Sequence, residues 1–346
     1  MSSFDFSREL IDWYLGAARD LPWRRTKDPY AIWVSEIMLQ QTRVEAVKPY
    51  YHRFLKELPD VPALAEASEE QLHKLWEGLG YYSRVRNMQR AARTCMELYG
   101  GVLPPDHDKL LSLCGIGEYT AAAVSSIAFG IPAPAIDGNV LRVMGRYLAI
   151  DRVITDKDSK KEIRAFLSSV IPWDRPGDFN SAMMELGATL CGPDKAARCG
   201  GCPLVSQCRA FKEGRTDTLP VKAPRAEKRV EKKTVLLLRS KKGIALEKRP
   251  PRGLLAGLWQ PPMADGFLSE GQVTKLLEER GCAVLSIEEL PPARHVFTHI
   301  VWEMKAFALT VKEEGTFSFF GGESIKEKAL PSAFSAYRKY IEENSK

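Results

Sequence analysis

Hydrophobic side chains recur at intervals of three and four residues over the first 211 positions of the chain. This spacing places them on one face of a helix, and short breaks rich in Pro, Gly and Asp separate the segments. The spacing is clearest in four segments: Phe6-Leu10-Trp13-Tyr14, Val34-Ile37-Met38, Ile163-Phe166-Leu167-Val170 and Met183-Met184-Gly187-Ala188. We therefore predict a mainly α-helical domain over residues 1–211.

The pattern changes after residue 211. Residues 212–233 hold eight Lys or Arg, four acids and two prolines with few hydrophobic residues, which predicts a solvated linker. From residue 234 the hydrophobic runs shorten to strand length, and a Ser-Lys-Lys-Gly turn predicts a hairpin. The expected strands are Val235–Leu238 with Ile244–Leu246, and 296–302 with 306–309; helices are expected over 273–280 and 331–344. Residues 234–346 are thus predicted to form a separate α+β domain.

The composition agrees with two globular domains and excludes a disordered chain. The 346 residues are 45% hydrophobic and 27% charged, and the net charge of +6 permits a polyanionic partner without requiring one. The longest uncharged run, Tyr119–Ile136, contains Gly130 and two prolines, so it favours a buried helix and a turn over a membrane span. Residues 1–10 show no secretory signal.

Four of the seven cysteines, Cys191, Cys199, Cys202 and Cys208, lie within 18 residues. Without a secretory signal we do not expect disulfides, so this density predicts four thiolate ligands around one metal centre. A tetrahedral zinc ion and a cubane iron–sulfur cluster both accept four thiolates, and the spacing leaves both open.

Two carboxyl groups are candidates for acid–base chemistry. Glu36 lies in a mostly apolar helical segment, which should raise its pKa, whereas Asp137 precedes a predicted helix, whose backbone amides should keep it ionised. Such a pair is the arrangement that breaks a glycosidic bond. The alternative is that Asp137 only caps a helix and Glu36 only forms a salt bridge.

Three further segments are candidates for nucleic-acid contacts. In Leu113–Ala121 a helix ends, Gly115 and Gly117 turn the chain and a second helix starts, which suits a DNA phosphate but also a plain helical turn. The segments Gln40-Gln41-Thr42 and Gly78–Arg84 carry polar or aromatic side chains at helix ends. They could enter a base stack as wedges, or their tyrosines could simply pack on the domain surface.

Together these motifs resemble those of the helix–hairpin–helix, iron–sulfur DNA glycosylases, and within them the MutY-type adenine DNA glycosylases. The matching segments are Leu21–Arg24, Glu36–Thr42, Gly78–Arg86, Gly115–Gly117, Asp137–Asn139 and the four cysteines. The resemblance implies a six-helix barrel plus an iron–sulfur domain, followed by a Nudix-like domain. It also implies a [4Fe-4S] cluster, and as substrate double-stranded DNA with adenine opposite 8-oxoguanine or guanine.

The resemblance further implies roles for individual residues. Glu36 matches the acid that protonates adenine N7, and Asp137 the carboxylate that stabilises the sugar cation, in a retaining reaction. Tyr119 matches a pocket tyrosine beside Asp137, and Asn139 would hold Asp137 in place. The remaining DNA-binding positions carried over are Trp23 and Arg24 in the adenine pocket; Gln41, Thr42, Tyr81 and Tyr82 at the base stack; Gly115 and Gly117 in the hairpin; and Phe297, Thr298 and His299 at 8-oxoguanine.

Several negative expectations follow from the same comparison. Bifunctional relatives carry a lysine where this chain has Tyr119, so we expect a monofunctional enzyme rather than an endonuclease III-like lyase. Lys275 interrupts the Nudix box, so a nucleotide hydrolase is disfavoured. A catalytically silent DNA-lesion binder is the alternative of a different class, and the presence of both carboxylates argues against it. We expect a monomer, located in the cytoplasm and associated with the nucleoid if the source is bacterial, with no membrane contact.

Overall fold

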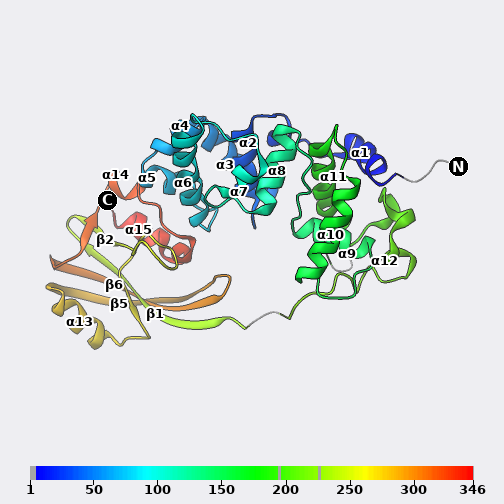
Figure 1. Ribbon diagram of the computed structural model, residues 1–346. Coiled ribbons are helices and arrows are strands. Elements are labelled where there is room, and N and C mark those ends of the chain that lie inside the picture. Colours follow the sequence, from blue (N-terminus) through cyan, green and yellow to red (C-terminus); the bar gives the residue numbers. More distant parts are fainter. Residues whose placement is uncertain (1–4, 194–195, 225–226, 346) are drawn as a thin grey trace. The chain divides into compact units, whose positions relative to one another are not determined.

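The computed structural model describes residues 5–193, 196–224 and 227–345. These residues form two compact units, which are considered separately (Figure 1). The first unit contains residues 1–67 and 87–224, and the second contains residues 68–86 and 225–346. Two positions of the predicted linker, 225 and 226, lie outside the described residues. No helix in the described part of the chain is both long and apolar enough to cross a membrane.

The first unit is helical, as the spacing of its hydrophobic residues predicts. All four of the segments named for their helical spacing fall inside helices. The elements are α1 (Phe6–Ala17), η1 (Pro22–Arg24), α2 (Pro29–Leu39), α3 (Val44–Glu57), α4 (Val61–Glu66), α6 (Ser83–Leu98, whose first turn belongs to the second unit), α7 (His107–Ser112), α8 (Glu118–Phe129), α9 (Gly138–Tyr147), α10 (Lys157–Val170), α11 (Pro176–Thr189), η2 (Cys199–Gly201), η3 (Val205–Gln207) and α12 (Arg209–Lys212).

Aspartates start several of these helices. The side chains of Asp5, Asp28, Asp60 and Asp106 each accept hydrogen bonds from backbone N–H groups of the following first turn. These donors have no partner within the helix, so a carboxylate at this position fixes where the helix begins. Asp137 does the same for α9.

The helices that carry the two candidate carboxyl groups are anchored in different parts of the core. Nine consecutive residues of α2, Tyr30 to Met38, are buried, so this helix lies inside the unit rather than on its surface. The helix α9 packs on α1, α10 and α11 through a cluster that includes Phe6, Leu10, Phe179 and Leu186. Both helices are therefore held on several sides, and the side chains they present keep fixed positions.

The second unit is built on a mixed seven-stranded sheet within the described residues, with the strand order β3-β2-β1-β6-β5. Strands β1 and β6 run parallel, β4 pairs with β1, and β7 pairs with β2. The elements are α5 (Glu69–Leu75), β1 (Arg229–Ser240), β2 (Gly243–Lys248), β3 (Trp259–Gln260), β4 (Met263–Asp265), α13 (Glu270–Glu279), β5 (Cys282–Val296), β6 (Ile300–Glu314), β7 (Ser318–Phe320), α14 (Glu323–Lys326), η4 (Ser332–Tyr337) and α15 (Arg338–Glu343).

The sheet is covered on both faces. Val235 and Leu237 of β1 pack into one hydrophobic cluster, whereas Leu236 and Leu238 pack into another. Alternation along a strand sends neighbouring side chains to opposite faces, so β1 is the central strand of a two-sided core. The predicted hairpin of β1 and β2 is present, with Ser240 paired to Gly243.

The prediction of a second strand pair was wrong in its pairing. Residues 296–302 and 306–309 do not pair with each other, because positions 300–314 form the single strand β6. Its antiparallel partner is β5, which the sequence did not reveal because most of its residues are exposed and lack an alternating pattern. The register also shifts between Leu290 and Ala293, where two prolines interrupt the ladder.

Two boundaries also differ from the expectation. Strand β1 begins at Arg229, inside the segment predicted as a linker, because pairing with β6 orders these charged residues. Residues 68–86 group with the second unit rather than with the helices around them in sequence. Helical spacing identifies the buried face of a helix but not the element that buries it, so this grouping was not predictable.

Candidate active site

Glu36 projects from the middle of the buried helix α2. The residue is only 5% exposed, and the residues before and after it are also buried. A carboxyl group in such surroundings loses most of its hydration, which disfavours the charged form. Burial accordingly raises the pKa of Glu36 to about 7, and the nearby charge of Asp137 adds to the rise. The sequence-based expectation of a raised pKa is confirmed for this group.

Asp137 occupies the N-cap position of α9, as predicted. Its carboxylate accepts hydrogen bonds from the backbone N–H of Val140 at 2.7 Å and from the Asn139 side-chain amide at 2.8 Å. Burial nevertheless raises the pKa of Asp137, although these hydrogen bonds oppose the rise. The expectation that capping alone would control this carboxyl was incomplete, because the sequence did not show how deeply it is buried.

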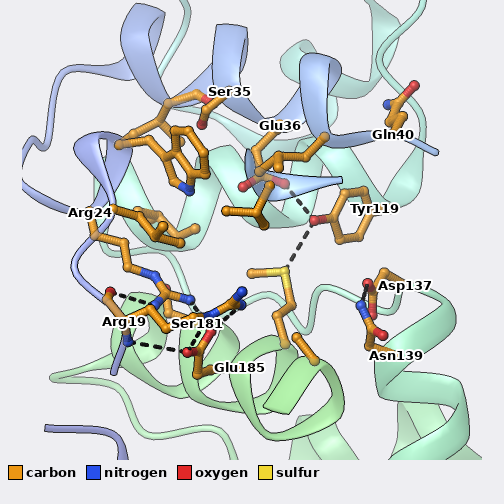
Figure 2. Close-up of a pocket in the computed structure, with 18 of the residues that line it drawn as sticks. Arg19, Arg24, Ser35, Glu36, Gln40, Tyr119, Asp137, Asn139, Ser181 and Glu185 are labelled. Atoms are coloured by element: carbon orange, nitrogen blue, oxygen red, sulfur yellow. Dashed lines mark hydrogen bonds and ion pairs between the residues drawn. The ribbon is translucent and has the colours of Figure 1, made fainter. Parts of the chain in front are cut away.

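Both carboxyl groups line the same cavity, which has a volume of about 710 Å³. Figure 2 shows Glu36 and Tyr119 pointing towards each other, with Asp137 and Asn139 at another wall of this pocket. Nothing in the sequence placed these two acids near each other, since 101 positions separate them along the chain. The volume lies within the range of sites that enclose a small organic group.

Tyr119, at the start of α8, contacts the carboxyl of Glu36 directly. Its hydroxyl donates to Glu36 Oε2 at 2.5 Å (Figure 2). The hydroxyl oxygen of Tyr119 also lies 3.1 Å from Met184 Sδ. Burial, together with the charges of Glu36 and Asp137, raises the pKa of Tyr119 well above its ordinary value. The phenol therefore stays neutral and remains a hydrogen-bond donor, which lowers the pKa of Glu36 against the effect of burial.

Glu185 is a site residue that the sequence analysis missed. It is fully buried on α11, lines the pocket, and accepts hydrogen bonds at 2.7 Å from both Arg19 and Arg24. Burial opposes ionisation of Glu185, but the two guanidinium groups outweigh it and lower the pKa to about 2. The available signal was a lone carboxylate within the apolar segment around Met183 and Leu186, which needs a charged partner.

Five other predicted site residues line the same cavity. They are Trp23 and Arg24, predicted for the adenine pocket, Gln41 and Thr42, predicted for the base stack, and Asn139, predicted to hold Asp137. The backbone of Gln41 adopts a positive φ of 59°, which is uncommon for a residue with a side chain and fixes the direction in which that side chain leaves the helix end.

The predicted hairpin lies between α7 and α8. Gly115 has a φ of 79°, and a Cβ atom there would lie 2.6 Å from the Cβ of Asn87, so this turn requires glycine. Gly117 instead caps α8 with a φ of −93° and has open space around it. The expectation that both glycines serve the same conformational need is therefore correct only for Gly115.

The two tyrosines predicted to meet the base stack differ in exposure. Tyr81 is 46% exposed and has a positive φ of 46°. Tyr82 is 7% exposed and packs edge-to-face against His73, with 5.7 Å between the ring centroids. The structure does not support a DNA contact for Tyr82, because its side chain contributes to packing inside the second unit.

Phe297, Thr298 and His299, which we call the recognition loop, connect β5 to β6 in the second unit. Thr298 and His299 are exposed, whereas the ring of Phe297 packs edge-to-face against Trp302 with 4.9 Å between the centroids. The loop therefore presents two polar side chains and is anchored by its aromatic residue.

The four clustered cysteines line one small pocket beside α9 in the first unit. Burial raises the pKa of Cys202 to about 12, and the charges of the other three cysteines add to the rise. Positions 194 and 195 of the intervening loop lie outside the described residues. In the described part of the chain, no three His, Cys, Asp or Glu side chains are placed to hold a single metal ion.

Arg142, also missed by the sequence analysis, connects the cysteine loop to the carboxylate of Asp137. Its guanidinium donates to the Cys191 carbonyl at 2.8 Å and to the side-chain oxygen of Asn139 at 2.9 Å. Asn139 in turn donates to Asp137. A continuous set of hydrogen bonds thus fixes the orientation of the Asn139 amide, and through it one oxygen of the Asp137 carboxyl.

Comparison with known proteins agrees with these two units. Residues 34–171 match the family model of the HhH-GPD superfamily base excision DNA repair proteins, and residues 234–340 match that of the NUDIX domain. The adenine DNA glycosylase of Mus musculus is 36% identical over 89% of this chain and 71% of its own length. The chain belongs to the adenine DNA glycosylase family.

The Arabidopsis thaliana adenine DNA glycosylase is also 36% identical, over 91% of this chain, and the chain spans 59% of that relative's length. Among solved structures, a thermostable thymine-DNA glycosylase is 28% identical with a TM-score of 0.56, covering 60% of this chain and 95% of its own. The mainly helical glycosylase fold followed by an α+β Nudix-like domain is thereby confirmed, and the protein is a base-excision-repair enzyme.

The buried carboxyl of Glu36 makes a prediction about stability. Its pKa is about 7 in the folded protein and 4.5 in an unfolded chain. The stability it contributes is therefore fully present below pH 4.5 and is lost as the pH rises through 7. As the pH rises from 5 to 8.5, the free energy of unfolding of Glu36→Gln should therefore increase relative to that of the native protein, by up to about 3 kcal/mol.

Thermal unfolding of both proteins across this pH range measures the difference. Glu97→Gln, which removes an exposed carboxyl from α6, is the matched control and should show no such pH-dependent gain. A Glu36→Gln protein whose advantage is the same at pH 5 and pH 8.5 would show that Glu36 is not desolvated.

Proposed function

We propose that the protein is a monofunctional DNA glycosylase that removes adenine from duplex DNA where adenine is mispaired with 8-oxoguanine or with guanine. The observation that carries this proposal is the convergence of Glu36, Asp137 and Tyr119 on one pocket. A base inside a duplex cannot reach such a pocket, so the adenosine must be flipped out of the stack. Arg24 and Glu185 line the pocket as a hydrogen-bonded pair, and their polar atoms can bind the edge of a purine.

Glu36 acts first as the acid. With a pKa of about 7, its carboxyl holds a proton in a large fraction of molecules at neutral pH. It transfers this proton to N7 of adenine, and the bond between N9 and C1′ of the sugar breaks with its electron pair going to the base. Tyr119, which donates to the carboxylate, stabilises the charged form that Glu36 leaves behind.

Asp137 stabilises the positive charge that develops on the sugar. In the retaining course that the family resemblance implies, its carboxylate forms a covalent bond to C1′. Glu36, now a carboxylate, takes a proton from water, and the resulting hydroxide displaces Asp137 from C1′. Asn139 and the backbone N–H of Val140 hold the Asp137 carboxylate in place throughout.

The absence of an amine at position 119 supports a monofunctional reaction. Cleavage of the DNA strand by bifunctional glycosylases uses a lysine that forms a Schiff base with the sugar. The phenol of Tyr119 cannot form that adduct, and its hydroxyl is committed to Glu36. The reaction should therefore stop at the abasic site.

The remaining DNA contacts are proposed from placement and exposure. The Gly115 turn and the start of α8 suit a backbone phosphate, and Gln41 and Tyr81 suit the gap left by the flipped base. Thr298 and His299 in the exposed recognition loop suit the opposite base. The second unit would thus bind the lesion rather than hydrolyse nucleotides, since Lys275 stands on α13 where a magnesium site needs a carboxylate.

A [4Fe-4S] cluster fits the four cysteines. Four thiol ligands surround one pocket, which is the donor set that such a cluster needs. Cys191, Cys199, Cys202 and Cys208 would hold the cluster, which would stabilise the loop behind Arg142. An absorbance band near ~400 nm with stoichiometric iron and sulfide tests this assignment, and bound zinc would contradict it.

We further propose that the enzyme acts as a monomer in the cytoplasm, at the nucleoid if the source is bacterial. The family membership supports a site of action at DNA. The sequence contains no coiled-coil repeat of the kind that would indicate an oligomer.

A duplex with one adenine opposite 8-oxoguanine tests the proposed activity. After incubation with the protein the strand should remain intact and should break at the adenine position only after hot alkali. Glu36→Gln and Asp137→Asn should each lower the single-turnover rate about 10²–10⁴-fold, because each removes a group that acts in the transition state. Their affinity for the duplex should change far less.

The same assay separates the alternatives. Glu97→Gln again serves as the control for Glu36→Gln. A borohydride-trapped covalent adduct formed at the rate of base release would indicate a bifunctional enzyme. Binding of the mispair without any alkali-labile site would indicate a silent lesion-binding protein.

A further inference from the structure

The hydroxyl of Tyr119 lies between two acceptors of unequal strength. Its oxygen is 2.5 Å from Glu36 Oε2 and 3.1 Å from Met184 Sδ, and Figure 2 shows both interactions as dashed lines. A phenol carries one hydrogen, so it donates to only one of these atoms at a time. A carboxylate accepts a hydrogen bond far more strongly than a thioether sulfur, so the charge of Glu36 decides which atom receives the hydrogen.

Met184 is held in this position by the helix that carries it. It lies on α11, lines the active-site cavity and is half-buried, whereas the neighbouring Met183 is only 1% exposed and lies in the hydrophobic core. The backbone of α11 lies against that of α8, since a Cβ atom on Gly177 would lie 2.8 Å from the carbonyl oxygen of Ser126. The spacing of the two helices therefore fixes the distance between the Met184 sulfur and the Tyr119 hydroxyl.

The hydrogen bonds around Tyr119 must change when Glu36 changes its charge. When Glu36 is ionised, the phenol donates to Oε2 and the Met184 sulfur receives no hydrogen from it. When Oε2 carries a proton, two hydrogens cannot both lie between oxygens that are 2.5 Å apart. The carboxyl is the stronger acid and donates to the phenol oxygen, so the phenol hydrogen turns to the second acceptor, Met184 Sδ.

We propose that Met184 accepts the Tyr119 hydrogen whenever Glu36 is protonated, and so helps the buried acid to hold its proton until adenine enters the pocket. Met184 is then a positioning residue, because it acts on the substrate only through Tyr119 and Glu36. Proton transfer to adenine N7 breaks the carboxyl O–H bond, forms the N7–H bond and leaves a carboxylate on Glu36. The phenol hydrogen then returns from sulfur to Oε2 by rotation of one hydroxyl, without movement of any helix.

Other ionisable groups also act on Glu36, and the test leaves them in place. Asp137 raises the pKa of Glu36, and Arg24 lowers it. The elements around Glu36 also carry charged groups that pair with one another, which are Glu185 with Arg19 and Arg24, and Glu45 with Lys48 on α3. These groups are the same in every variant that differs only at Met184 or Tyr119, so a change in the pKa of Glu36 reports on the sulfur and the hydroxyl.

Met184→Leu tests the proposal, because leucine keeps much of the volume of methionine but has no acceptor atom. The direct measurement is the pKa of Glu36 in the substrate-free protein, from the pH dependence of the infrared band of its protonated carboxyl. Glu36→Gln identifies that band by removing it. The pKa of Glu36 should be about 0.5 lower in Met184→Leu than in the native protein, the size expected of one weak hydrogen bond.

The rate of adenine release should follow the same change. With the lower pKa, Glu36 is protonated to nearly the same extent at pH 5.5 but about threefold less at pH 8.5. Single-turnover release from the A:8-oxoguanine duplex should therefore be nearly equal for Met184→Leu and the native protein at pH 5.5, and about threefold slower for the variant at pH 8.5. A change in packing alone would slow the reaction by the same factor at both pH values.

Two further variants isolate the role of the sulfur. Met183→Leu makes the same replacement at the neighbouring core position and should leave the pKa of Glu36 unchanged. Repeating Met184→Leu in a Tyr119→Phe background removes the hydroxyl whose hydrogen the sulfur accepts. In that background Met184→Leu should no longer lower the pKa of Glu36, because the two residues act through one bond.

The comparison of the two backgrounds decides the proposal. An equal effect of Met184→Leu on the pKa of Glu36 in the native and Tyr119→Phe backgrounds, zero included, would overturn it, because Tyr119 would then donate to Glu36 in both charge states. The titration needs no DNA, whereas the effect on the rate rests on the proposed function. Failure of the proposed function is thus a separate result, in which the native protein releases no adenine although the titration behaves as described.

Discussion

The arrangement of the active site depends on one desolvated carboxyl group. Glu36 lies within a helix whose middle is buried on all sides, and burial raises its pKa to about 7. The Tyr119 hydroxyl and the nearby Asp137 then adjust this value in opposite directions. A carboxyl of this kind is a proton donor at neutral pH, which an exposed glutamate is not. The cost is stability, since the same burial disfavours the folded state whenever Glu36 is ionised.

Other parts of the first unit hold Asp137 and Asn139 in fixed positions relative to Glu36. Asp137 is fixed by its role as a helix cap and by Asn139, which Arg142 in turn connects to the cysteine loop. A Cβ atom on Gly187 would lie 2.5 Å from the Cβ of Asn139, so only glycine lets α11 approach α9 this closely. The close packing of α11 on α9 therefore helps to fix Asn139, and through Asn139 the orientation of the Asp137 carboxylate.

Much of this was predictable from local patterns, and the rest depended on contacts between distant segments. Helical spacing gave the helices, and an isolated acid in an apolar segment identified Glu36 and its raised pKa. No local pattern showed that Asp137 shares its cavity, or that Glu185 is ionised by two arginines. The strand β5 was missed for the same reason, because its exposed residues carry no hydrophobic alternation and only pairing with β6 defines it.

The pH dependence of single-turnover adenine release tests the central claim most directly. Because Glu36 must be protonated to act as the acid, the rate should be highest below pH 7 and should fall about tenfold for each pH unit well above its pKa. Tyr119→Phe should move this fall to higher pH, since it removes the hydrogen bond that favours the charged form of Glu36. A rate that is constant or rises between pH 6 and pH 9 would contradict the account.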